Sequence, residues 1–452
     1  MPSLARSAVA PFYLFACLIL GGSAQGVWQN MVLQLSGIAI IAWAVAARTE
    51  QPMPRSARLP LLIVMLAIAI IALQEVPLPP AIWAHGSRAR IAHDYRLLGA
   101  PLPPLPFSLT PYGSLNSLLG IIPPLAISTA MVRVNAYRPG LLAGALLAAT
   151  IAGVALGALQ VVSADPNSHW YLYPETNFGL GVGFFANANH MADLLVICLP
   201  FVAAIAAAAK GGDVQRYSAL LSILAGITAV LVVGIALNGS FAGYVLAVPV
   251  LCGSALIMLP PGSRWRGLAA GIAALSVIAS VAALANSSVG GTKIGKEASN
   301  SVQSREQILR TTEKALADYL PLGSGLGSFV KVYRLYESPD EVTNEYVIHA
   351  HNDYAELALE LGVPGIILLL LFLAWWIVQC LAIWRKGEGG PWARAASIAS
   401  ATILVHSLVD FPLRTAAISA CFAMCLALLA NRRAPVRQET DVLRPTRHVV
   451  IG

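Results

Sequence analysis

The feature that most constrains this chain is a series of apolar runs, each about as long as a helix that crosses a bilayer. Such a helix needs about 20 apolar residues. Twelve runs approach this length: 8–25, 31–47, 59–75, 114–134, 139–162, 190–208, 217–237, 240–259, 267–285, 357–384, 396–410 and 413–430. Hydrophobic residues make up 57% of the chain and charged residues only 11%, whereas soluble chains carry about 25% charged residues. We therefore predict an all-α polytopic membrane protein with about twelve transmembrane helices.

The charges between these runs give the chain an orientation. If the N-terminus lies inside, every short loop on that side is basic, as the positive-inside rule requires. The basic residues of these loops are Arg48, Arg55, Arg58, Arg133, Arg138, Lys210, Arg216, Arg264, Arg266, Arg385, Lys386 and Arg394. We therefore predict cytoplasmic termini and long loops that face outward. The basic loops also account for the net charge of +7, so that charge does not indicate a nucleic-acid partner.

Four regions follow from this map. They are an N-terminal transmembrane bundle with two outer loops (1–285), a large outer loop (286–356), C-terminal transmembrane helices (357–430) and a cytoplasmic tail (431–452). The first outer loop, 76–113, is rich in proline and is predicted to be ordered and largely non-helical. Within the large loop, residues 302–319 have the apolar stripe of an amphipathic helix.

The span centres carry no charged residues, and the nearest acids, Glu75, Asp193, Glu360 and Asp410, sit near outer ends. Ion-coupled transporters place charges inside their spans, so this pattern argues against them, although carriers of neutral substrates and flippases remain open. The sequence also has no P-loop, GxGxxG, HExxH or zinc-like Cys/His spacing. No closely spaced aspartate pair suits a divalent metal. We therefore expect no metal and no cofactor.

The outer boundary of the 357–384 run carries His351 and Asn352. The helix there is capped either by Asn352 or Asp353, or earlier by Asn344. With the earlier cap, His351 and Gly362 would share one helix face, and glycines on that face would let another backbone approach closely. A histidine near the positive end of a helix can act as a general base. The alternative is an interfacial histidine that only forms a hydrogen bond at the helix start.

Arg305 precedes the apolar stripe of the 302–319 helix and points along it, toward the protein body. An arginine on such a face is suited to bind phosphate with its planar fork. The alternative is an ion pair with one of the acids of the outer loops. Arg310 and Lys314 lie on another side of the helix, which is expected to face solvent.

Several motifs together resemble one family. The clearest is His351-Asn352 followed after nine residues by Gly362-Val363-Pro364-Gly365, which is similar to the histidine signature of the O-antigen ligase and polysaccharide polymerase family. Four further segments agree with it in order: Pro77–Pro80 with Ser108–Pro111, Gly183–His190, Arg305 with Pro321 and Gly323–Gly327, and His406–Pro412. The resemblance covers most of residues 70–430.

This resemblance implies a metal-independent, inverting glycosyltransferase in the bacterial inner membrane, with its active site facing the periplasm. The donor would be a glycan on a polyprenyl diphosphate, and the acceptor a sugar or a lipid core, in a polymerase or a ligase reaction. His351 would be the general base or would position the acceptor. Arg305 would neutralise the diphosphate, with Asn352 and Asn189 as further substrate-binding candidates. Besides these two substrates, only membrane lipids are expected as partners.

One departure from the family pattern concerns a second arginine. Members commonly carry a Ser-Arg pair at the outer start of the span after a tight turn, where this chain has Ser240-Phe241. Arg310, Arg334 or Arg414 could take over the phosphate-binding role. The departure also leaves open a second function, a polyprenyl-linked glycan transporter or a non-catalytic binder.

Three other polar residues have structural interpretations. His190, at the start of a span, is expected to form a boundary hydrogen bond, and His406 to be packed in the interior. Asp410 could pair with Arg414 four residues later if the short turn between them is helical.

Overall fold

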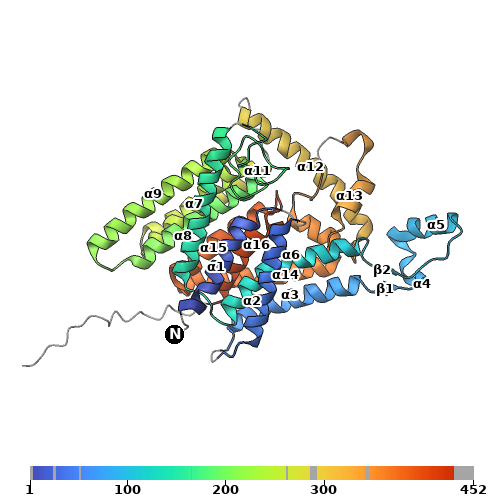
Figure 1. Cartoon of the computed structure of the whole chain (residues 1–452), viewed down its shortest axis with the longest axis horizontal. Coiled ribbons are helices and arrows are strands. Elements are labelled where there is room, and N and C mark those ends of the chain that lie inside the picture. The colour runs from blue at the N-terminus through green and yellow to red at the C-terminus, as the bar shows by residue number, and fades with distance from the viewer. Residues whose placement is uncertain are drawn as a thin grey trace, which may run out of the picture.

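The computed structural model describes residues 4–23, 27–49, 52–163, 165–260, 263–285, 293–342 and 346–431. The predicted tail lies outside the described residues except for Asn431. The fold is all-α, as predicted, and every predicted run falls on a helix (Figure 1). In the described part of the chain, nine helices are long and apolar enough to cross a membrane, and two shorter apolar helices accompany them.

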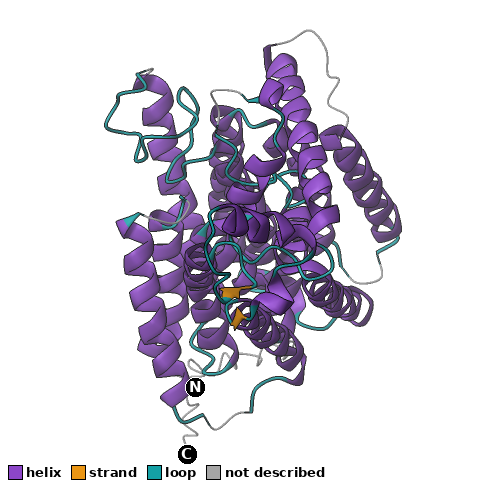
Figure 2. Cartoon of the chain, turned by 90° about the vertical axis from the view of Figure 1, so that its right-hand side faces the viewer, coloured by secondary structure: helices purple, strands orange, loops and turns teal. Residues whose placement is uncertain are grey.

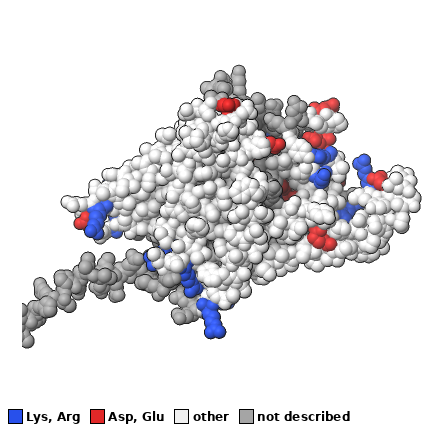
Figure 3. Space-filling model, in the orientation of Figure 1, with Lys and Arg blue, Asp and Glu red and all other residues white. Residues whose placement is uncertain are grey.

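The helices on which the twelve predicted runs fall are α1 (Leu4–Leu20), α2 (Trp28–Ala46), α3 (Arg55–Gln74), α6 (Pro111–Val132), α7 (Pro139–Ser163), α8 (Ala188–Ala209), α9 (Val214–Asn238), α10 (Phe241–Met258), α11 (Trp265–Ala285), α14 (Asp353–Lys386), α15 (Gly390–His406) and α16 (Ala416–Ala430). Helix α8 is the most buried of the candidate spans, and it packs against α7, α9, α10 and α15. Figure 3 shows charged side chains at the two ends of one face, with an uncharged band between them. This is the surface that a multi-pass membrane protein presents to lipid.

The first outer loop differs in part from the prediction. It contains two short helices, α4 (Pro80–Trp83) and α5 (Ala89–Leu97), and two two-residue strands, β1 (Pro77–Leu78) and β2 (Leu105–Pro106), which pair antiparallel. The strands lie on the side that faces the viewer in Figure 2. The prolines gather at both ends of this loop, and the proline-free stretch between them has room for the nine-residue helix α5.

The amphipathic helix of the large outer loop is present but longer than predicted. It is α12 (Lys293–Tyr319), and it is followed by α13 (Phe329–Tyr336). We call these two helices the cap. Ile308, Ala315 and Tyr319 of the predicted stripe are buried, and they form a small apolar cluster with α13 and with Leu359 of α14. The cap therefore rests on the first turns of α14 (Figure 1).

Helix α14 begins at Asp353 with Asn352 as its cap, so the later of the two predicted starts is correct. The Asn352 side chain accepts hydrogen bonds from the backbone N–H groups of Tyr354 (3.1 Å) and Ala355 (2.9 Å). His351 consequently precedes the helix, and the expectation that it shares a helix face with Gly362 is wrong.

The predicted close approach of backbones at the glycines is confirmed. Gly362 has φ +63°, and the helix is broken there. The turn after α12 packs into the break, where Val363 N–H donates to the Pro321 carbonyl (2.8 Å) and Gly325 N–H to the Glu360 carbonyl (3.0 Å). A Cβ at Gly362 would lie 2.3 Å from the Pro321 carbonyl oxygen. Only glycine fits both the conformation and the contact.

Substitution of Gly362 by alanine should therefore lower thermal stability strongly. This backbone conformation, with φ +63° and ψ −152°, is open essentially only to glycine and costs about 1–3 kcal/mol with a Cβ, and the backbone clash adds to that cost. Gly99 is the matched control, because it also has a positive φ (+64°), but a Cβ at this position would have nothing within 4 Å. Thermal unfolding in detergent should show a clearly larger loss for Gly362→Ala than for Gly99→Ala. Equal losses would mean that the contact between Gly362 and the turn after α12 contributes nothing to stability.

Candidate active site

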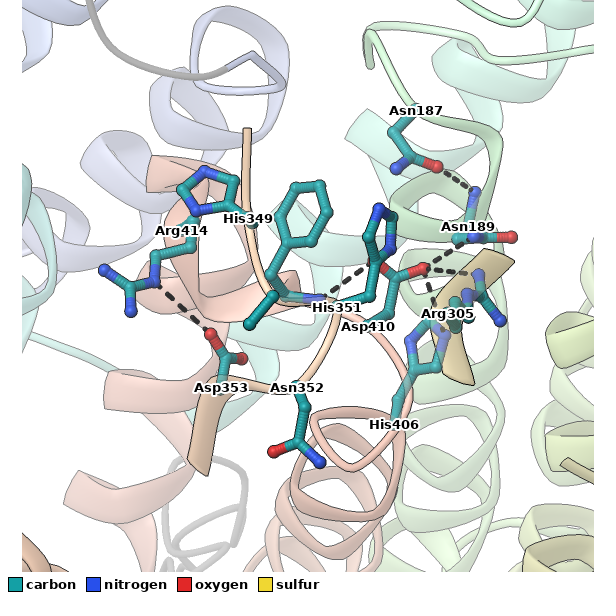
Figure 4. A network of polar contacts seen from close by, with 12 residues as sticks. Asn187, Asn189, Arg305, His349, His351, Asn352, Asp353, His406, Asp410 and Arg414 are labelled. Atoms are coloured by element: carbon teal, nitrogen blue, oxygen red, sulfur yellow. Dashed lines mark hydrogen bonds and ion pairs between the residues drawn. The ribbon is translucent and has the colours of Figure 1, made fainter. Parts of the chain in front are cut away.

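The site is built around the carboxylate of Asp410, which lies fully buried in the turn between α15 and α16. Side chains from three separate segments meet on this carboxylate (Figure 4). Asn189 Nδ2 donates to Oδ2 at 2.6 Å and Arg305 Nη2 donates to the same oxygen at 3.2 Å. His351 Nδ1 lies 3.5 Å from Oδ1. The sequence predicted all three of these partners as site residues, but it did not identify Asp410 as the group that joins them.

His351 is held at the edge of this cluster by the chain that leads into α14. Its φ is +48°, a left-handed conformation that is uncommon for residues other than glycine and often found at functional sites. Its ring packs edge-on against Phe411, with 4.9 Å between ring centroids. The side chain is 26% exposed. Because Nδ1 faces Asp410, Nε2 on the other side of the ring is the nitrogen that can reach a substrate.

Arg305 reaches the cluster from the cap. It lies on α12 and its side chain is 18% exposed, whereas that of its partner Asp410 is fully buried. The sequence left two interpretations open, a phosphate-binding arginine and an ion pair with a loop acid. Arg305 does form an ion pair, but its partner is Asp410 of the C-terminal bundle, and a single guanidinium N–H carries that contact. The remaining donors of the guanidinium group leave it able to bind an anion as well.

Asn189 is positioned by the first turn of α8 and by α10. Asn187 caps α8 by accepting the Asn189 backbone N–H at 2.8 Å. The Asn189 side-chain oxygen accepts a hydrogen bond from Ser240 Oγ at 2.7 Å, so its amide nitrogen is directed to Asp410. Ser240, the residue before the departure at Phe241, thus orients a member of the cluster.

The electrostatics of the cluster keep Asp410 ionised. Burial by itself would raise the pKa of this carboxyl, but the His351 ring and the Arg305 guanidinium beside it hold the pKa well below its usual range. Asp410 can therefore act as an anion that orients both side chains at neutral pH.

Arg414 belongs to a second cluster, and the predicted pair with Asp410 is wrong. Its guanidinium lies 3.4 Å from Asp353, 3.2 Å from Glu356 and 3.7 Å from Glu360, all on α14. Helix α15 ends at His406, and Pro412 starts a separate turn, so the i,i+4 geometry of a helix is absent between Asp410 and Arg414. Arg305 and Arg414 lie on opposite sides of His351 (Figure 4).

The other two candidates for the second arginine lie outside the cluster. Arg310 is 71% exposed and pairs with Glu306 on the same helix, and Lys314 is likewise exposed. Arg334 stacks over the ring of Tyr346, 4.1 Å from its centroid. Asn352 has its own structural contacts, because besides capping α14 it donates to the Leu408 carbonyl at 2.9 Å.

Two further histidines, His190 and His406, lie near the cluster, and only His190 differs from its sequence interpretation. His190 is buried against Phe411, and neither of its ring nitrogens has a hydrogen-bond partner among the described residues. The predicted boundary hydrogen bond is therefore wrong. His406 is fully buried, as predicted, but its Nδ1 also lies 2.7 Å from Asp193 Oδ2.

This arrangement places an accessible imidazole and an accessible guanidinium on either side of one buried anion. The imidazole can take a proton from a hydroxyl, and the guanidinium can stabilise negative charge on a phosphate. Among the described residues, no group of three or more His, Cys, Asp or Glu side chains is placed to hold a metal ion.

The comparison with protein families adds one finding. Residues 219–370 match the family described as O-antigen ligase. The matched region contains the cap, His351 and the Gly362 break, and it ends before Asp410. No curated protein matches the chain.

Proposed function

We propose that this chain, which carries an O-antigen ligase family domain over residues 219–370, is a membrane glycosyltransferase that transfers a glycan from a polyprenyl diphosphate to a sugar or lipid-core acceptor. The reaction takes place at the periplasmic face of the bacterial inner membrane. The observation that carries the proposal is the convergence of His351 and Arg305 on the buried Asp410 carboxylate. Transfer from a diphosphate needs a base for the attacking hydroxyl and a cation for the leaving group.

In the proposed reaction, His351 Nε2 takes the proton of an acceptor hydroxyl. The hydroxyl oxygen then forms a bond to the anomeric carbon of the donor glycan, on the face opposite the diphosphate. The bond between that carbon and the phosphate oxygen breaks, so the configuration inverts and the polyprenyl diphosphate leaves with the bonding electrons. His351 afterwards releases its proton to water. This scheme uses side chains only and assigns no step to a metal.

Arg305 stabilises the negative charge that develops on the leaving diphosphate, the kind of electrostatic contribution that is often the largest in catalysis. Asp410 holds the guanidinium in place through one N–H, and it also faces Nδ1 of the base. The Asp410 carboxylate thus positions both the imidazole of His351 and the guanidinium of Arg305.

The departure at Phe241 still leaves the transporter or binder as the second candidate. None of the three replacement arginines joins the His351 cluster, and Arg414 is surrounded by carboxylates. A transporter has no evident need for a base, so dependence on His351 and Arg305 separates the two functions.

Replacement of Arg305 tests the proposal directly. Arg305→Ala should lower the rate of transfer by about 10²–10³-fold, as the loss of one transition-state donor typically does. Arg305→Lys should recover only part of the rate, because the charge remains but the planar fork is lost. The substrate for the assay is the lipid-linked glycan that a deletion strain accumulates, extracted from its membranes.

Lys314→Ala is the matched control, because it removes an exposed cation from the same helix. It should keep its rate within about twofold, as surface charges contribute little. Similar losses in both variants would point to general damage of the cap, and full activity of Arg305→Ala would remove Arg305 from the mechanism.

A further inference from the structure

A fully buried pair of ionisable side chains lies directly behind the Asp410 carboxylate. His406 Nδ1 is 2.7 Å from Asp193 Oδ2, and both side chains have no exposed surface. Asp193 lies in the second turn of α8 and His406 at the end of α15. Ionisable groups in the apolar part of a membrane protein are costly to bury and are by default candidates for a functional role.

The pair is oriented toward the active site. His406 Nε2, the second ring nitrogen, lies 3.8 Å from Asp410 Oδ2. That is the oxygen to which Asn189 and Arg305 donate. Two carboxylates therefore flank one imidazole ring, and only one of them, Asp410, contacts the residues of the proposed reaction.

The contact with Asp193 determines which proton His406 presents. If the proton between the pair is on Nδ1, Asp193 is an anion. In that state a bare Nε2 lone pair would face the Asp410 anion, so a second proton on Nε2 is favoured. If the proton is on Asp193, Nδ1 of a neutral His406 accepts the hydrogen bond, and the proton of the ring is then on Nε2. In both states Nε2 carries a proton that points toward Asp410. The two residues together are then electrically neutral, which lowers the cost of burying them.

We propose that Asp193 and His406 are positioning residues that direct an N–H group at Asp410, so that its carboxylate stays ionised and correctly oriented between Arg305 and His351. The inference rests on the proposed transfer reaction. Neither residue touches the substrate, and both act through Asp410. The alternative is a purely structural link between α8 and α15.

The proposal predicts a change in pH dependence. The charged and titratable groups around Asp410 are Arg305 from α12, His351 before α14, His406 from α15, and His190 and Asp193 from α8. Loss of the His406 N–H removes one group that stabilises the anion, so the pKa of Asp410 rises. Asp410 then gains a proton at a higher pH, so the rate falls more steeply on the acid side of the pH–rate profile, below the limb that protonation of the base His351 sets.

Asp193→Asn is the first test. The asparagine amide can donate to Nδ1 of His406 or accept from it. When it accepts, it stabilises the tautomer in which Nε2 has no proton to direct at Asp410. We expect the maximal rate to fall on the order of 10–100-fold, as for other residues that orient a functional side chain. The KM for the extracted lipid-linked glycan should stay within about threefold, and the rate should fall more steeply with falling pH on the acid side of the profile. Thr150→Val is the control, because it removes a different buried polar contact of α8, that with Cys198.

Variants of His406 make the test specific. The amide nitrogen of glutamine reaches the position of Nε2, whereas that of asparagine reaches only the position of Nδ1. His406→Gln should therefore keep more activity than His406→Asn. The double variant Asp193→Asn, His406→Gln should be more active than Asp193→Asn alone, because the glutamine amide presents an N–H group without tautomer control.

The outcomes separate this inference from the proposed function. Asp193→Asn with the rate and pH profile of Thr150→Val would overturn the positioning role. A double variant that shows the summed losses of both single variants would also overturn it, and would indicate a structural link. His351→Ala measured in parallel tests the reaction itself, so normal transfer by that variant would instead contradict the proposed function.

Discussion

The His351→Ala variant should insert normally into the membrane and lose glycan transfer by about 10²–10⁴-fold, the usual contribution of a general base. The reason is geometric. Nδ1 of His351 faces the buried Asp410, and the side chain is 26% exposed, so Nε2 is the nitrogen available to a hydroxyl. Alanine removes this nitrogen without adding bulk. The surface polysaccharide of a deletion strain complemented with the variant would measure the loss.

His351→Gln is the matched variant, because an amide nitrogen can occupy the position of Nε2 but cannot accept a proton. It should lose activity nearly as strongly as alanine if His351 is a base. Substantial activity of the glutamine variant would show that His351 only positions the acceptor. The accumulated species would then distinguish the reactions, since single repeat units indicate a polymerase and long lipid-linked chains indicate a ligase.

The Asp410→Asn variant should lose transfer on the order of 10²–10³-fold, because it weakens the two proposed catalytic side chains together. An asparagine has the same shape as an aspartate, but it has one acceptor oxygen and no charge. It cannot accept from Arg305 and Asn189 on one oxygen while presenting the other to His351, as Asp410 does. The initial rate with extracted lipid-linked glycan measures the effect.

Asp353→Asn provides the control for this variant. Asp353, like Asp410, is a buried carboxylate that pairs with an arginine. When Asp353 loses its charge, however, its partner Arg414 still has Glu356 and Glu360 as partners. We expect its rate to remain within about threefold of the wild type, since the arginine stays paired. If Asp353→Asn and Asp410→Asn lost equal activity, the central role of Asp410 would not hold.

Hydropathy was sufficient to predict the long apolar helices, but not α4, α5 or α13. Each predicted run falls on a helix, because in a bilayer the length and apolarity of a segment decide its structure. The apolar stripe of α12 was predicted from its helical periodicity, and Ile308, Ala315 and Tyr319 of this stripe are buried against α13 and α14. The start of α12 at Lys293 was not predicted, because no apolar pattern marks the residues between Lys293 and the predicted helix start at residue 302.

The centre of the site could not be predicted from local spacing. Asp410 gathers Asn189, Arg305 and His351, which come from three distant segments. A rule based on i,i+4 spacing selected Arg414 as its partner, because that rule considers only neighbours on one helix. The available signal was an acid within His406–Pro412 at the end of an apolar run, where an unpaired charge would be costly.

The break at Gly362 was likewise only half predictable. Glycine spacing indicated a close contact, but the partner is the turn from Pro321 to Gly325, and its approach depends on how the cap packs. The start of α14 at Asp353 then places His351 before the helix, in a left-handed conformation. Both features follow from tertiary packing, which a single sequence does not display.

The most direct test of the proposed function is transfer by the purified protein in lipid vesicles, with lipid-linked glycan from the deletion strain as the only donor. We expect the wild type to cleave the bond between glycan and diphosphate and to form a longer or acceptor-linked glycan, while His351→Ala leaves the donor intact. Free polyprenyl diphosphate and the product would be measured together. Movement of the intact donor across the bilayer without bond cleavage, or normal cleavage by His351→Ala, would contradict the proposed function.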